Sequence, residues 1–67
     1  MATGTLRWFN VKKNLGFITQ DLGGEEVVLD LNFFTWKELD TLIVGTRVEY
    51  TYIEDRGICV ATSARLI

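Results

Sequence analysis

Residues 15–31 read LGFITQDLGGEEVVLDL, and this stretch decides the fold. Its first five and last five residues are interpreted as strands, in which successive side chains fall on alternate faces: Leu15, Phe17 and Thr19 share one face of the first, and Val27, Leu29 and Leu31 share one face of the second. Between these runs lie Gly23 and Gly24, which adopt positive φ without a Cβ clash and therefore favour a turn. The stretch predicts two neighbouring strands, over residues 15–19 and 27–31, joined by that turn.

Three more strands are expected on either side of this pair. Residues 3–10 are rich in strand formers and have apolar residues of both parities, as happens where a strand bulges or curves in a barrel. Residues 46–53 alternate, which predicts that Val48, Tyr50 and Tyr52 face one way. The sequence EDRG then predicts a turn, and residues 58–66 follow as the last strand.

The connection after the third strand has a different period. Thr35 and Glu38 match a capping box, and the apolar spacing that follows predicts one or two helical turns between residues 35 and 42. Gly45 ends that segment. We therefore expect an all-β fold, a five-stranded antiparallel barrel with a short helical turn after the third strand, in which residues 1–67 form a single domain.

Composition excludes several classes of function. The chain has 67 residues, a formal charge of −2, no histidine and one cysteine. Without histidine, the usual general base and the commonest metal ligand are both missing, and Cys59 alone forms no internal disulfide. Nothing after Met1 matches a signal peptide, and no stretch approaches 18 apolar residues. We expect a soluble, cytoplasmic, noncatalytic domain with no cofactor, metal, membrane or small-molecule substrate.

The charge is distributed unevenly along the chain. Residues 1–20 carry a net charge of +3, residues 21–40 carry −5, and residues 41–67 are neutral. One interpretation is that these charges are only solvated and keep the protein soluble. The other is that the first two strands carry a local basic strip that binds an anionic partner.

Four segments resemble the bacterial cold-shock domain, and the similarity extends over nearly the whole chain. They are GTLRWFN, KKNLGFIT, VVLDL and GTRVEY, at residues 4–10, 12–19, 27–31 and 45–50. The resemblance implies a barrel of the OB type. It also implies a noncatalytic protein that binds single-stranded RNA or DNA by stacking bases on exposed aromatic side chains of the second and third strands.

Several of the family's aromatic positions differ here. Asn14 and Leu15 replace a Gly and a Phe of the first family motif, Val28, Asp30 and Leu31 replace Phe, His and Phe of the second, and Leu39 replaces a Phe of a loop. Each stacked base contributes about 1–3 kcal/mol, so these replacements predict weak binding with little sequence preference.

The resemblance assigns roles to six side chains that match the family. Arg7, Lys13 and Arg56 would contact phosphates, Trp8 and Phe17 would stack on bases, and Asn10 would hydrogen-bond a base edge. Local alternatives remain for some of them. Trp8 and Phe9 are adjacent, so one of them packs in the core or at its rim, and Phe17 packs under a loop if it does not stack. The alternative for Lys12 and Lys13 is that they belong to a solvated loop and contact no ligand.

Two features of residues 21–40 fit a second function. Phe33, Phe34 and Trp36 form an apolar cluster that either closes the barrel end or is an exposed patch that meets a partner, and Trp36 is also a candidate replacement platform. Asp30 either accepts a hydrogen bond from a base, pairs with a basic side chain, or marks loss of nucleic-acid binding. The alternative is therefore a barrel reused for protein interaction or self-association, with nucleic-acid binding reduced or lost.

Overall fold

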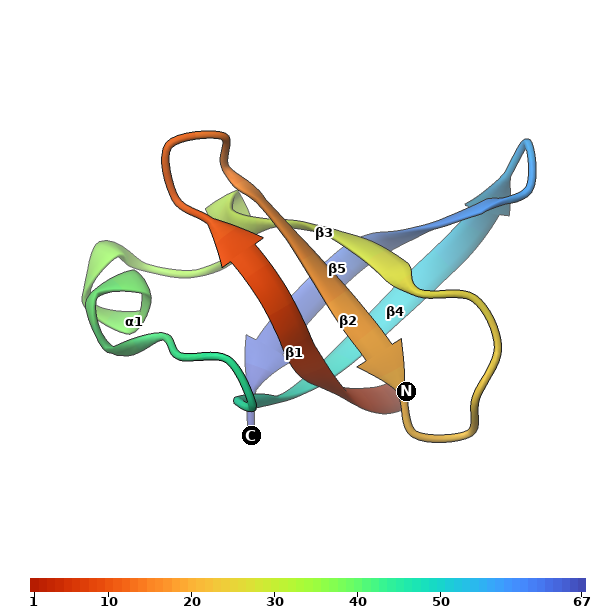
Figure 1. The fold of residues 1–67 in the computed structure, drawn as a ribbon, viewed down its shortest axis with the longest axis horizontal. Helices are drawn as coiled ribbons and strands as arrows, with labels where there is room; N and C mark the ends of the chain where they lie inside the picture. The colour runs from red at the N-terminus through yellow and green to blue at the C-terminus, as the bar shows by residue number, and fades with distance from the viewer.

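The structure, a computed structural model, describes all residues 1–67 as a closed barrel of five strands (Figure 1). In chain order the elements are β1 (Ala2–Asn10), β2 (Leu15–Gln20), β3 (Val27–Asp30), a 3₁₀ turn η1 (Leu31–Phe33), α1 (Trp36–Thr41), β4 (Arg47–Asp55) and β5 (Ile58–Leu66). Every predicted strand is present, with ends that differ by two residues at most. The strand order around the barrel is β1-β2-β3-β5-β4.

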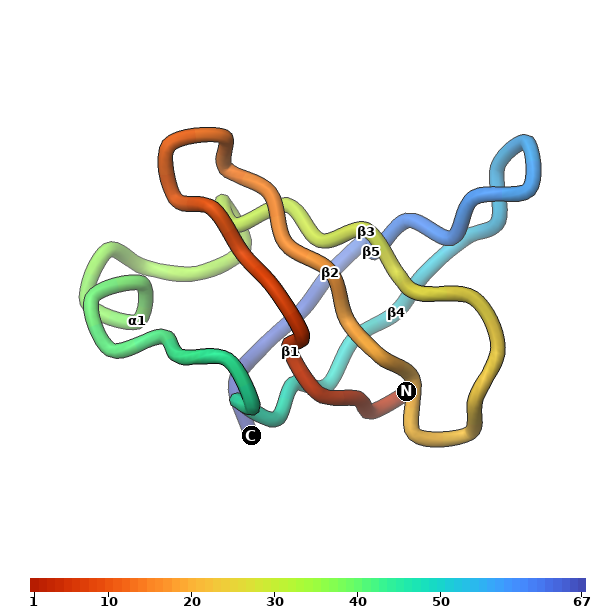
Figure 2. Tube along the Cα trace, viewed as in Figure 1, coloured from red at the N-terminus to blue at the C-terminus, as the bar shows by residue number.

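One strand pair differs from the all-antiparallel prediction. The pairs β1–β2, β1–β4, β2–β3 and β4–β5 are antiparallel, whereas β3 and β5 are parallel. The reason is topological, since a closed ring with an odd number of strands cannot alternate in direction all the way round. The connection through η1 and α1 crosses one end of the barrel, and β5 therefore returns beside β3 in the same direction (Figure 2).

The core forms from the inward faces that the alternating pattern predicts. Gly16 and Ile18 of β2 are buried, as are Val27 and Leu29 of β3, while their neighbours point outward. In β4 the alternation fails near its end. Tyr52 is exposed because the pairing register shifts after Thr51. The fully buried side chains with the largest volumes are Tyr50, Leu6, Ile18, Leu29, Leu31, Val27 and Val48.

The predicted bulge lies in β1. Leu6 pairs with Ile18 and Trp8 pairs with Phe17, so Arg7 is the extra residue in β1. This insertion puts Arg7 and Trp8 on the outside in succession and returns Phe9 to pack against the core. The bulge resolves the choice between the two adjacent aromatics, since Phe9 is the packed one and Trp8 the exposed one.

The short helix begins as the sequence predicts. The Thr35 hydroxyl accepts a hydrogen bond from the Glu38 backbone N–H at 3.2 Å, and the Thr35 backbone N–H donates to the Glu38 carboxylate at 2.8 Å. This capping box satisfies backbone donors at the helix start that have no partner within the helix. The helix has six residues, so no helix of this structure has the length to cross a bilayer.

Candidate nucleic-acid interface

Two aromatic side chains lie together on the outer face of the barrel. Trp8 and Phe17 are register partners on β1 and β2, and their ring centroids are 5.4 Å apart with an interplanar angle of 32°. Trp8 is 41% exposed, and Phe17 is half-buried between the buried residues Gly16 and Ile18. The pair therefore presents ring surface to solvent and is able to receive stacked bases.

The outward row continues from these rings with aliphatic side chains. Phe17 pairs with Val28, Val28 with Val60, and Val60 with Ile53, so the row crosses β2, β3, β5 and β4. Val28 and Val60 are half-buried and Ile53 is exposed. Val28 is the place where the cold-shock motif has a phenylalanine. Within this row of paired strand residues, the aromatic side chains are thus Trp8 and Phe17.

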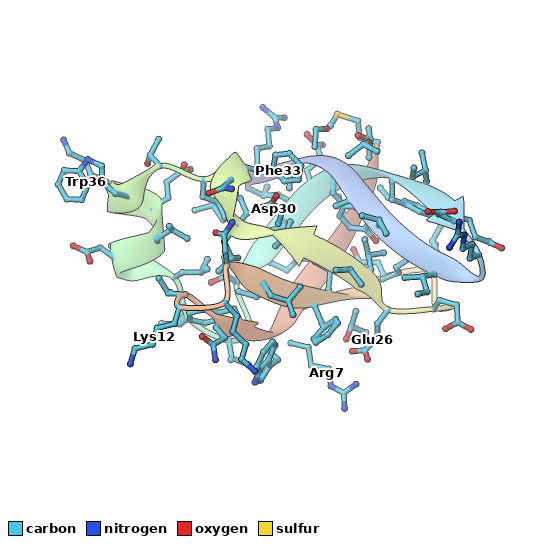
Figure 3. All side chains as sticks on the ribbon, turned by 90° about the horizontal axis from the view of Figure 1, so that it is seen from above. Arg7, Lys12, Glu26, Asp30, Phe33 and Trp36 are labelled. Carbon is cyan, nitrogen blue, oxygen red and sulfur yellow. The ribbon has the colours of Figure 1, made fainter.

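The predicted phosphate contacts are only partly free. The Arg7 guanidinium donates to the Glu26 carboxylate at 2.8 Å, and Figure 3 shows the two side chains side by side along the β1–β2 edge of the face. Lys12 and Lys13 are exposed in the loop between β1 and β2 and make no ion pair. A phosphate near Arg7 therefore competes with Glu26, whereas the two lysines are available.

Two other predicted site residues are held in turns. The Asn10 side-chain oxygen accepts a hydrogen bond from the Lys13 backbone N–H at 3.1 Å, so one function of Asn10 is to hold the β1–β2 loop. Arg56 lies in the turn between β4 and β5 with a φ of 53°. That hairpin projects from the barrel at the opposite end from the β1–β2 loop (Figure 1). The structure therefore does not bring Arg56 together with Lys13.

Asp30 has a structural function that sequence reasoning did not find. Its Oδ1 accepts a hydrogen bond of 2.8 Å from Asn14 Nδ2 and another of 2.8 Å from the Asn32 backbone N–H. The second bond makes Asp30 the N-cap of η1. Asn14 has a φ of 57°, which asparagine tolerates better than most residues and which explains how it replaces the family's glycine. The one sign of this function in the sequence is that an aspartate, a residue that often bonds to the backbone two residues further on, directly precedes the turn.

The predicted patch of Phe33, Phe34 and Trp36 does not exist as a unit. Phe34 is only 6% exposed and belongs to the core, so its assignment to an exposed patch is wrong. Phe33 is 39% exposed and Trp36 is 71% exposed. Figure 3 shows Phe33 beside Asp30, with Trp36 at the far end of the helical segment. The three side chains separate because they belong to different local structures: Phe33 ends η1, Phe34 follows in extended backbone, and Trp36 begins α1.

The strongest electrostatic effect lies away from this face. The Arg47 guanidinium donates to Asp21 Oδ1 at 2.6 Å, and the Thr3 hydroxyl donates to Asp21 Oδ2 at 2.6 Å. The hydrogen bonds from Arg47 and Thr3 hold the pKa of Asp21 well below its usual range, and the pair raises the pKa of Arg47. This network ties the β2–β3 turn to β1 and β4.

Replacing Asp21 by asparagine is expected to change the pH dependence of stability. The folded state depresses the Asp21 pKa, so the carboxylate stabilises the fold above the unfolded pKa of about 4, and this contribution is lost as the pH falls toward the folded pKa. The melting temperature of D21N should lie below that of the wild type at pH 7, and the gap should shrink at lower pH. Thermal unfolding across pH checks this, with Glu25→Gln as the control; a gap independent of pH would contradict it.

A hollow of about 400 Å³ lies beside the same network. It is bounded in part by Met1, Leu22 and Tyr52. The Tyr50 hydroxyl donates to the Gln20 side-chain oxygen at 3.1 Å, while burial raises the Tyr50 pKa.

The closed barrel and its exposed aromatic pair define an OB-type barrel with a candidate face for single-stranded nucleic acid. The family model described as the 'Cold-shock' DNA-binding domain matches residues 2–67. The chain is 48% identical over 50 residues to the cold shock-like protein CspA of Stigmatella aurantiaca, which covers 75% of this chain and 74% of that protein.

Two further relatives give the same result. Cold shock protein CspV of Vibrio cholerae is 42% identical over 48 residues, 72% of this chain and 69% of that protein. Cold shock-like protein CspLB of Listeria monocytogenes is 37% identical over 54 residues, 81% of this chain and 80% of that protein. The chain belongs to the cold-shock domain family, a family of nucleic-acid-binding proteins rather than of known enzymes.

Proposed function

We propose that this protein binds single-stranded RNA or DNA with modest affinity and little sequence preference, without catalysis, in the cytoplasm. The observation that carries the proposal is the exposed Trp8–Phe17 pair at a 5.4 Å centroid separation. Stacking on ring faces accepts every base, so two platforms supply affinity without much discrimination. By keeping bases unstacked from one another, such a protein opposes secondary structure in RNA.

The cations of this face limit the electrostatic part of binding. Lys13 is exposed in the β1–β2 loop, Arg7 is engaged by Glu26, and Arg56 lies in a hairpin distant from that loop. Three phosphate contacts would give a salt slope no steeper than about −2 in a plot of log affinity against log salt concentration. Binding should therefore be weak and also only moderately sensitive to salt.

Fluorescence anisotropy of a labelled single-stranded oligonucleotide at several salt concentrations tests this proposal. We expect saturable binding with a shallow slope, and no comparable binding of a duplex of the same length, because paired bases cannot stack on Trp8 and Phe17. A slope much steeper than −2, or equal affinity for the duplex, would show that phosphate contacts and not stacking dominate.

Replacing Val28 by phenylalanine should increase the affinity. Val28 is the register partner of Phe17 on the outward face, so the new ring would extend the aromatic row onto β3. One added platform is expected to tighten binding by at least about 5-fold. Val60→Phe is the matched control, since it places the same ring one strand further away. If V28F binds with the affinity of the wild type, the bound strand does not contact the position of Val28.

The aliphatic row favours a second candidate function, self-association. Val28, Val60 and Ile53 form an apolar strip between the basic β1–β2 loop and the β4–β5 hairpin, which carries Glu54 and Asp55. The loop and the hairpin project from opposite ends of the barrel (Figure 1), so a two-fold pair of copies would bring the basic loop of one copy toward the hairpin of the other, where Glu54 and Asp55 outnumber Arg56.

Sedimentation velocity over a wide range of protein concentrations tests self-association. If two copies pair through this strip, Ile53→Glu should abolish the dimer and leave the fold intact, because Ile53 is exposed. Single-stranded oligonucleotide should also shift the wild type to monomer, because both partners use the same face. A strict monomer at all concentrations would rule this candidate out.

A further inference from the structure

Asp30 presents one oxygen that the protein itself does not use. Both hydrogen bonds to its carboxylate, from Asn14 Nδ2 and the Asn32 backbone N–H, go to Oδ1 at 2.8 Å. No side chain or backbone donor bonds to Oδ2, and no arginine or lysine pairs with this carboxylate. Asp30 is also exposed. The carboxylate is therefore fixed in orientation by the fold while half of its accepting capacity stays free.

The Asp30 side chain lies on the same outward face of the sheet as Phe17. Asp30 is the register partner of Leu15, and Phe17 is the register partner of Val28. Asp30 and Phe17 are thus diagonal neighbours across β2 and β3, which places their Cβ atoms about 7–8 Å apart. A base is roughly as wide as that separation, so one that stacks on Phe17 brings a hydrogen-bonding edge to Asp30 when it is oriented toward β3.

We propose that Asp30 Oδ2 accepts a hydrogen bond from the exocyclic amino group of the base stacked on Phe17. The inference rests on the proposed binding of single-stranded nucleic acid and departs from its low sequence preference at one position, where it names the class of base that is favoured. Cytosine, adenine and guanine carry such an amino group, and aspartate accepts from it well. Uracil and thymine offer only a ring N–H between two carbonyl oxygens, which the carboxylate repels.

The fixed position of the carboxylate is what makes this contact effective. Asn14 and Asn32 hold Asp30 before any ligand arrives, so little side-chain freedom is lost on binding. The carboxylate also repels phosphates, which lowers the affinity for every strand alike. A ratio of affinities between two strands with the same backbone removes that shared effect and isolates the contact to the base.

The test compares oligo-dC with oligo-dT, because both bases are pyrimidines with similar stacking surfaces. The wild type should bind oligo-dC about 5- to 30-fold more tightly at equal salt. The variant Asp30→Asn keeps an oxygen for Asn14 and Asn32 but presents an amide N–H₂ donor in place of Oδ2. We therefore expect D30N to bind both strands and to lose or reverse the preference for oligo-dC.

Two results would overturn the assignment and leave the proposed function standing. One is a wild type that binds oligo-dT as tightly as oligo-dC, and the other is a D30N variant whose affinity ratio equals that of the wild type. Circular dichroism of D30N verifies that the barrel is intact. If the wild type binds neither strand, the proposed function fails, and the assignment of Asp30 fails with it.

Discussion

Replacing Trp8 by alanine should weaken the binding of a single-stranded oligonucleotide by about 10- to 100-fold. This range corresponds to the loss of roughly 1.4–2.8 kcal/mol, as expected for removal of one stacking platform. Trp8 is 41% exposed and lies outside the core, so the barrel should remain folded. Anisotropy titration of a labelled oligonucleotide measures the effect, and circular dichroism verifies the fold.

Trp36→Ala is the matched control because it removes the same side chain from another surface. Trp36 is 71% exposed in the helical segment, beside Lys37 at 5.7 Å from its ring centroid. We expect W36A to bind as the wild type does. Weakening by W36A equal to that of W8A would show that the helical segment supplies a second platform, and an unchanged affinity of W8A would exclude the Trp8–Phe17 face.

The second large effect is expected at Gly4. A Cβ atom added there would lie 2.5 Å from the Thr19 carbonyl oxygen and 2.6 Å from Ile18 Cγ2. The backbone oxygen belongs to the neighbouring strand β2 and cannot move without breaking the β1–β2 pairing. Gly4→Ala should therefore lower the free energy of unfolding by about 1–3 kcal/mol, a large part of the roughly 3–5 kcal/mol expected for a domain of this size.

Gly16→Ala is the control for this prediction. Gly16 is also a buried glycine of the β1–β2 pair, but its nearest neighbour to an added Cβ is the Trp8 carbonyl oxygen at 3.2 Å. Urea unfolding followed by circular dichroism should show G4A to be clearly less stable than G16A. Equal stability of the two variants would mean that the strands separate locally at low cost.

The local parts of the fold could be predicted because their causes are local. Alternation in residues 15–19 and 27–31 follows from one buried face, and the capping box at Thr35 follows from two side chains three residues apart. The mixed parity around Trp8 predicted a bulge, because an extra residue changes which parity faces the core. The exposure of Trp8 follows from that bulge.

Other features depend on residues that are distant in sequence. The Arg7–Glu26 ion pair spans 19 positions, and the bond from Asn14 to Asp30 spans 16. Burial of Phe34 depends on how η1 crosses the barrel end, which no periodicity encodes. The parallel β3–β5 pair follows from ring closure rather than from either strand's sequence. The candidate site residues could therefore be named from the sequence, whereas the side chains that fix or occupy them could not.

The contacts of Asp30 in the structure change the interpretation of this residue. In the sequence, an aspartate at a family histidine position is compatible with loss of nucleic-acid binding. In the structure, its Oδ1 caps η1 and receives Asn14, which stands at positive φ in place of the family's glycine. Asn14 and Asp30 thus act together to connect the β1–β2 loop to the end of β3, and Oδ2 is left without a partner in the protein.

The most direct measurement of the central claim is a fluorescence titration of Trp36→Phe, in which Trp8 is the single remaining tryptophan. A single-stranded oligonucleotide of about eight nucleotides is long enough for a barrel of this type. The stacking account predicts saturable quenching of Trp8 at low salt. An unchanged Trp8 spectrum up to about 300 μM strand, beyond the usual range of nonspecific binding, would contradict it.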